Sequence, residues 1–262
     1  MRSDSDAFYD PLTANLFQAN RATIGPWDVT LQDGGPPAAL LSHALEAQGG
    51  PSGTRIARLT FDFFGPVPVS QVAIDAEVLR PGSRIQLSCA TMRAGGRIVM
   101  RATAWRLLAE AGRSPSVPSG FVAPLLPPHE AEARFPGLER FPYGDAIEWR
   151  FVDGGFGDLG PATVWTRCRI PLVRGSALSG LERVLIMVDA ANGISAVLPM
   201  AAWTFVPVDL TVVLERLPDS DWVGMAARTV LGTDGIGMTE TQLFDAQGAL
   251  GRALQTLYVA PR

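Results

Sequence analysis

The sequence predicts an α+β protein built from two tandem copies of one unit, in which a helix lies against an antiparallel sheet. Three observations predict this fold class. A proline-rich segment divides the 262-residue chain into halves of similar length, the halves align without a gap, and both show the same order of helix and strand patterns. Apolar residues make up 47% of the chain and charged residues 18%, a composition suited to a buried core.

The proline-rich segment covers residues 109–145 and shows no sustained helical or strand period. We therefore expect an N-terminal unit at 1–112, a surface linker at 113–144 and a C-terminal unit at 145–262. The prolines of this segment are Pro115, Pro118, Pro124, Pro127, Pro128, Pro136 and Pro142.

The two halves carry a weak internal repeat. Moving residues 57–108 onto 208–259 aligns Leu59 with Leu210 and Thr60 with Thr211. Alternating apolar residues between turn-forming segments predict four antiparallel strands in each half. We expect them at 56–64, 72–79, 85–92 and 97–107 in the first half, and at 208–214, 222–231, 236–244 and 249–259 in the second.

Each half also carries one helical pattern ahead of these strands. The first covers residues 36–48, after Gly34 and Gly35. The second covers residues 178–191, with Asn192 and Gly193 as its stop signal. Each half thus reads as one strand, one helix and four antiparallel strands.

Four short segments extend this pattern into a family resemblance: Asp-Gly-Gly at 33–35, Val-Asp-Ala-Ala-Asn at 188–192, Asp-Leu-Thr-Val at 209–212, and Gly-Arg-Ala-Leu-Gln-Thr-Leu at 251–257. Their joint order resembles the TesB-like acyl-CoA thioesterases, which fuse two hotdog units. The resemblance implies a double hotdog, with two antiparallel sheets that each wrap around a central helix and join into one continuous sheet. It also implies hydrolysis of acyl-CoA.

The resemblance carries over to particular residues only in part. Family members place an Asp on the helix of the second hotdog and a Gln in the last strand, where this chain has Asp189 and Gln255. They also place a Thr or another small polar residue at a position where this chain has Pro207, which has no side-chain donor. Thr204 or Asn192 is the candidate substitute.

The residues themselves point to the same pair. Asp189 interrupts an apolar helical run, and an unpaired buried carboxylate is costly, so we expect it to be paired, neutralised or catalytic. The alternative is a capping or solvent-facing acid, although a helix C-terminus disfavours negative charge. Gln255 could instead be an outward-facing residue of its strand. In the repeat Gln255 falls on Ala104, and the first helix has no acid matching Asp189, so the polar pair occurs once.

Such a pair suits thioester hydrolysis without a Ser or Cys nucleophile. A water held by Asp189 as general base and oriented by Gln255 could attack the electrophilic carbonyl. The backbone N–H groups of Gly34 and Gly35 are candidate oxyanion donors at a helix N-terminus, and an ordinary helix-start turn is an equally good interpretation.

Other chemistries and partners find little support. The net charge of −4 gives no reason to expect nucleic acid or a membrane as partner. We expect no metal and no cofactor, because the chain has two histidines, His43 and His129, and two cysteines, Cys89 and Cys168, expected as free thiols. The first ten residues lack an apolar segment, so we expect no secretory signal and a cytoplasmic protein.

Three functions therefore remain open. The first is acyl-CoA hydrolysis in fatty acid metabolism, with the acyl chain between helix and sheet. The second is a non-catalytic acyl-thioester binding protein, because Pro207 replaces the polar residue that family members have at that position. The third is an enoyl thioester hydratase. That chemistry favours an Asp–His pair, and His43 has no obvious Asp or Asn partner in the sequence. We also expect a homo-oligomer.

Overall fold

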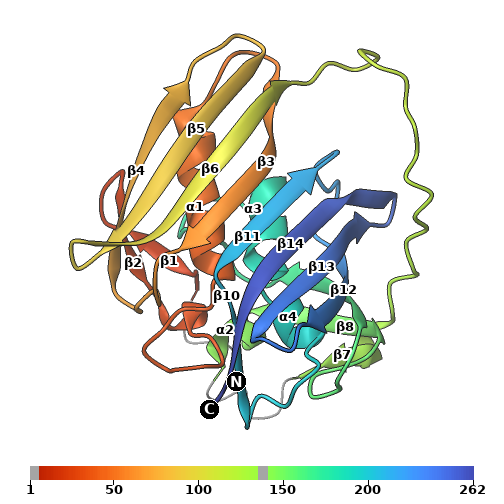
Figure 1. Cartoon of the computed structure of the whole chain (residues 1–262). Coiled ribbons are helices and arrows are strands. Elements are labelled where there is room, and N and C mark those ends of the chain that lie inside the picture. Colours follow the sequence, from red (N-terminus) through yellow and green to blue (C-terminus); the bar gives the residue numbers. More distant parts are fainter. Residues whose placement is uncertain (1–5, 135–140) are drawn as a thin grey trace.

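The computed structural model describes residues 6–134 and 141–262, and their strands form one antiparallel sheet (Figure 1). The first half contributes β1 (Tyr9–Pro11), β2 (Leu16–Ala19), β3 (Thr54–Phe63), β4 (Gln71–Arg80), β5 (Ile85–Ala94) and β6 (Arg97–Leu108). The rest contributes β7 (Glu132–Ala133), β8 (Ile147–Asp153), β9 (Ala162–Cys168), β10 (Trp203–Pro207), β11 (Asp209–Leu214), β12 (Val223–Leu231), β13 (Ile236–Asp245) and β14 (Gly248–Pro261). Their order is β1-β2-β4-β5-β6-β3-β11-β14-β13-β12-β9-β8-β7, and β10 also pairs with β14.

The two halves of the sheet join where β3 pairs with β11. Thr60 lies directly opposite Thr211 in this antiparallel pair, and their hydroxyl oxygens are 3.1 Å apart. These two threonines are also partners in the internal repeat, 151 residues apart. Equivalent residues therefore meet at the centre of the seam, as expected for a local two-fold relation between the units. The expectation of one joined sheet is confirmed.

Two helices, one from each half, pack against each other on one side of the sheet: α1 (Gly35–Gln48) and α3 (Gly180–Val188) (Figure 1). α1 contacts β4, β5 and β6, while α3 contacts β9 and β12. Ser179 precedes α3 and forms a capping box with Glu182. The Ser179 hydroxyl accepts from the Glu182 backbone amide, and the Glu182 carboxylate accepts from the Ser179 backbone amide. No helix in the described ranges is long and apolar enough to cross a membrane.

The second helix differs from the sequence prediction, which ran it to residue 191 and ended it at Asn192-Gly193. The helix α3 ends at Val188, and both of those residues lie inside a separate short helix, α4 (Ala191–Ile194). The Gln255 side chain donates to the Asp189 carbonyl, while the Gly193 amide bonds to the Ala190 carbonyl instead. A side chain from the last strand thus takes the carbonyl that a continuous helix would use.

Two further details correct the sequence prediction. Two strands, not one, precede the helix in each half: β1 and β2 before α1, and β8 and β9 before α3. The linker is also not wholly irregular, because it carries β7 at the sheet edge, a 3₁₀ turn (His129–Ala131) and the short helix α2 (Pro142–Asp145). Pro136 and the other residues of 135–140 lie outside the described residues.

Candidate active site

A cavity of about 670 Å³ opens where the N-terminus of α1 meets the C-terminus of α3. Most of its wall is apolar, and several aromatic side chains contribute to it: Trp27, Phe63, Phe141, Trp149 and Phe156. The polar residues Asp33, Asp189 and Asn192 also line it. An apolar cavity of this size with a few convergent polar groups is typical of a small-molecule site.

Asp189 follows the last residue of α3 and is 7% exposed. Its Oδ1 accepts a hydrogen bond from Gln255 Nε2 at 3.0 Å, and the Gly34 backbone also donates to the carboxylate. Burial raises its pKa to about 6, and these two hydrogen bonds oppose the rise. The C-terminus of α3 disfavours this charge, while the N-terminus of α1 favours it. Asp189 is therefore a buried carboxylate that titrates near neutral pH.

Gln255 points into the protein from β14. Side chains alternate along this strand, and Gln255 (2% exposed) shares the inner face with Ala253 and Leu257. Its Nε2 donates to both the carboxylate and the carbonyl of Asp189, each at 3.0 Å. Because both partners are acceptors, the amide orientation is fixed. Its buried Oε1 has no hydrogen-bond partner among the described residues. The outward-facing alternative is thereby excluded.

A chain of buried hydroxyl groups supports this pair from the sheet. Thr239 lies opposite Gln255 in the β13–β14 ladder, and its hydroxyl is 2.7 Å from that of Thr229. Ser195, directly after α4, lies 2.8 Å from Thr229 and donates to the Ala191 carbonyl. The hydroxyl chain fixes α4, one wall of the cavity, to the inner face of β12 and β13.

Gly34 and Gly35 bring the helix N-terminus unusually close to α3. A Cβ on Gly34 would lie 2.3 Å from Asp189 Oδ2, and one on Gly35 would lie 2.0 Å from the Ile186 carbonyl oxygen. The Gly35 amide donates to Asp33 Oδ1 at 3.2 Å, and the Gly34 backbone donates to Asp189. Both amides are thus bound to carboxylates, and their oxyanion role stays a prediction.

The candidates for the missing Thr lie in different places. Asn192 lines the cavity, and its Nδ2 donates to the Phe205 carbonyl at 3.1 Å, which ties α4 to β10. Pro207 also lines the cavity. Thr204 is in β10 opposite Ala260 and is not among the residues that line the cavity. Of the two candidate substitutes, only Asn192 therefore reaches the cavity.

Sequence reasoning missed Asp33 as a functional candidate, because it was read only as part of a helix-start motif. The signal was present, since an acid directly precedes two glycines at a helix N-terminus. Burial, followed by the negative charge of Asp189, raises the pKa of Asp33 well above its usual value. The charge of Asp33 also acts on two buried tyrosines, Tyr9 and Tyr143, and contributes to their raised pKa values. The Tyr9 hydroxyl donates to Gln32 Oε1 at 2.5 Å, and the Tyr143 hydroxyl donates to the Ile186 carbonyl at 2.7 Å.

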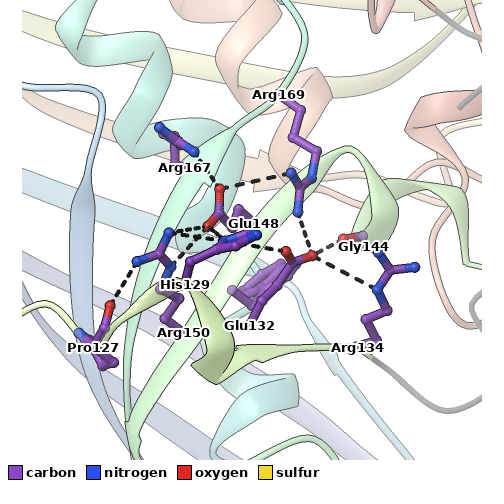
Figure 2. A network of polar contacts seen from close by, with 10 residues as sticks. Pro127, His129, Glu132, Arg134, Gly144, Glu148, Arg150, Arg167 and Arg169 are labelled. Atoms are coloured by element: carbon purple, nitrogen blue, oxygen red, sulfur yellow. Dashed lines mark hydrogen bonds and ion pairs between the residues drawn. The ribbon is translucent and has the colours of Figure 1, made fainter. Parts of the chain in front are cut away.

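A second polar cluster lies at the linker and not among the cavity residues (Figure 2). His129, Glu132 and Glu148 place potential metal ligands within 4.8 Å of one another. Arginines already occupy the carboxylates: Arg150 and Arg167 bind Glu148 at 2.5 and 2.6 Å. Although burial opposes it, these hydrogen bonds lower the pKa of Glu148 to about 2. The cluster fits a structural clamp between the linker, β8 and β9 better than a metal site.

One antiparallel sheet formed by two similar halves, with a helix from each half on one side, defines the double hotdog class. Solved structures share this fold. A thioesterase II candidate from Thermobifida fusca matches with a TM-score of 0.76 at 19% identity, covering 99% of this chain and 97% of that one. A hotdog protein of unknown function from Alicyclobacillus acidocaldarius gives 0.75 at 19% identity, covering 98% and 97%. The acyl-CoA thioesterase II TesB2 from Mycobacterium marinum gives 0.65 at 17% identity, covering 97% and 94%.

Family models identify the group within this class. Residues 23–107 match the acyl-CoA thioesterase N-terminal domain, and residues 123–259 match the acyl-CoA thioesterase C-terminal domain. The chain therefore belongs to the TesB-like acyl-CoA thioesterase family, and the expectation of a thioester hydrolase is confirmed. No curated protein sequence matches this chain.

Proposed function

We propose that this chain hydrolyses acyl-CoA with a water molecule that Asp189 activates and Gln255 positions. The observation that supports the proposal is the buried Asp189–Gln255 pair, held at 3.0 Å beside an apolar cavity of about 670 Å³. Asp189 lines that cavity, so a thioester carbonyl bound there would lie near it.

The reaction begins with the ionised form of Asp189 as general base. A water donates one hydrogen to Asp189 and the other to Gln255 Oε1, and its oxygen attacks the thioester carbonyl. The unpartnered buried Oε1 supports this placement of the water. Asp189 takes the proton as the carbon–oxygen bond forms, and the tetrahedral intermediate then breaks its carbon–sulfur bond.

The pH dependence follows from the same carboxyl group. Only ionised Asp189 can accept the proton, and its pKa is raised to about 6. We therefore expect kcat/KM to fall as the pH drops through about 6 and to level off above it. Because the negative charge of Asp189 also acts on Asp33, the acidic fall in kcat/KM reports the titration of both carboxyl groups together.

The rest of the site is assigned by position. We place the acyl chain against the aromatic wall of the cavity, where burial of apolar surface favours binding. Gly34 and Asn192 line the cavity and flank the reacting group, whereas Gly35 is not among the lining residues. The glycine amides could contact the developing oxyanion only by releasing their carboxylate partners. Thr204 has no role in the proposed site, because it is not among the residues that line the cavity.

The test is release of free thiol from a panel of acyl-CoA substrates, followed with a thiol-reactive dye. Asp189→Asn should lower kcat about 10²–10⁴-fold, the usual contribution of a general base. Asp153→Asn removes an exposed carboxylate of β8 outside the cavity and should leave kcat unchanged. Hydrolysis that persists in Asp189→Asn would refute the assignment of the base.

The second candidate is an acyl-thioester binding protein, and Pro207 at the family's Thr position favours it. This function predicts tight binding of acyl-CoA without thiol release. A hydratase is a weaker candidate, because His43 pairs with Glu182 at 2.7 Å and does not line the cavity. Conversion of enoyl-CoA, followed by loss of its conjugated absorbance, would support the hydratase.

We further propose several broader properties of the chain. The units divide at 1–112, 113–144 and 145–262, and each half of the sheet wraps around its own helix. The protein acts in the cytoplasm in fatty acid metabolism as a homo-oligomer. The proposed chemistry requires neither a cofactor nor a metal, because a carboxylate and an amide supply the proton transfer and the water position.

A further inference from the structure

Asp33 is a second carboxyl group in the cavity that the water-activating pair does not use. It directly precedes Gly34, whose backbone donates to Asp189, so Asp33 and Asp189 both lie at the N-terminus of α1. Both line the same cavity. The Asp33 main chain is held by a 2.7 Å hydrogen bond from its amide to the Thr23 carbonyl. Its carboxyl group therefore has a defined place beside the proposed base.

The surroundings decide which of the two carboxyls carries a proton. Asp189 is buried and Asp33 is partly buried, and the negative charge of Asp189 disfavours the ionised form of Asp33. Asp189 accepts from the Gln255 amide and the Gly34 backbone, whereas Asp33 accepts from the Gly35 amide. The charged form is thus better stabilised on Asp189, and the proton resides on Asp33.

The titration directions agree with this division. Burial raises the pKa of Asp189 to about 6, against two opposing hydrogen bonds, while burial and the Asp189 charge both act to raise the pKa of Asp33 well above its usual value. The other titratable groups that interact with Asp33 are the phenols of Tyr9 and Tyr143, whose pKa values burial raises, so they stay neutral. Paired acids with opposed environments are the usual arrangement of a general acid and a general base.

We propose that Asp33 is the general acid of the hydrolysis and protonates the departing CoA sulfur. This inference rests on the proposed function. Asp189 takes a proton from the attacking water as the carbon–oxygen bond forms. When the carbon–sulfur bond breaks, its electron pair goes to sulfur, and the Asp33 carboxyl gives its proton to that sulfur. The products are the free acid and CoA thiol, and the proton gained by Asp189 restores the starting state by transfer to Asp33.

The leaving group provides the sharpest test. An alkyl thiolate such as that of CoA is basic and gains from protonation, whereas an aryl thiolate leaves without help. Asp33→Asn should therefore lower kcat/KM about 10²-fold or more for an acyl-CoA, and less than about tenfold for the matching aryl thioester. Asp189→Asn should slow both substrates alike, and Asp33→Glu should recover part of the acyl-CoA activity.

The wild-type protein gives a second measurement that requires no variant to fold. With acyl-CoA, kcat/KM should also fall at alkaline pH as the Asp33 proton is lost, and with the aryl thioester this alkaline limb should be absent. An equal loss on both substrates in Asp33→Asn, no loss on either, or an alkaline limb independent of leaving group would overturn the inference. Absence of thiol release from every acyl-CoA by the wild type would instead refute the proposed function.

Discussion

The contact of Gly35 with α3 makes its replacement by alanine a stringent test of the helix packing. The new Cβ would lie 2.0 Å from the Ile186 carbonyl oxygen, against an ordinary carbon–oxygen contact of about 3.4 Å. Backbone atoms stand on both sides, so the helices must separate by about 1 Å or more, at a cost near the upper end of about 1–3 kcal/mol for overpacking.

The same carbonyl accepts the hydroxyl of buried Tyr143, which adds about 1 kcal/mol if that hydrogen bond is lost. The lower entropy of the unfolded alanine variant offsets about 0.4–1 kcal/mol. We therefore expect Gly35→Ala to lower the free energy of unfolding by about 2–3 kcal/mol. For a chain of this size that corresponds to a fall in Tm of about 5 °C.

Gly193→Ala is the matched control, because Gly193 is also helical and its Cβ would have no atom within 4 Å. Thermal unfolding followed by circular dichroism, with both variants under one buffer condition, makes the comparison. The control should equal or slightly exceed the wild-type Tm. If Gly35→Ala were as stable as Gly193→Ala, the close approach of α1 to α3 would be wrong.

The remaining predictions concern ion pairs. The hydrogen bond that His43 donates to the Glu182 carboxylate raises the pKa of His43. The contribution of this pair to stability is therefore full below about pH 6.5, the usual histidine value, and is lost as the pH rises through the raised folded value. His43→Gln should therefore lower Tm more at pH 6 than at pH 9, and an equal loss at both would contradict the pair. The lowered pKa of Glu148 means that its contribution is present above its unfolded value and is lost as the pH falls toward about 2. Glu148→Gln should cost about 2 kcal/mol at pH 7 in urea unfolding and much less near pH 2, whereas a pH-independent loss would argue against the arginine clamp.

Most of the fold follows from local patterns in the sequence. In β14 alternate residues from Ala253 to Val259 are buried, and this period-two pattern is visible without coordinates. The repeat that aligns Thr60 with Thr211 predicted two similar halves, and the structure places these two threonines opposite each other where the halves of the sheet join. The boundary of α3 could not be found in this way, because Gln255 binds the Asp189 carbonyl from 66 residues away.

The candidate site divides in the same manner. The sequence by itself determined that Asp189 and Gln255 are polar residues in apolar surroundings, since burying such groups unpaired is costly. Only the tertiary structure decided that they bind each other, that the Gly34 backbone donates to the Asp189 carboxylate, and that Asp33 shares their cavity. Strand and helix periods report neighbours a few residues apart. These contacts instead join the start of one helix, the end of another and the last strand, and their geometry exists only once α1 packs against α3.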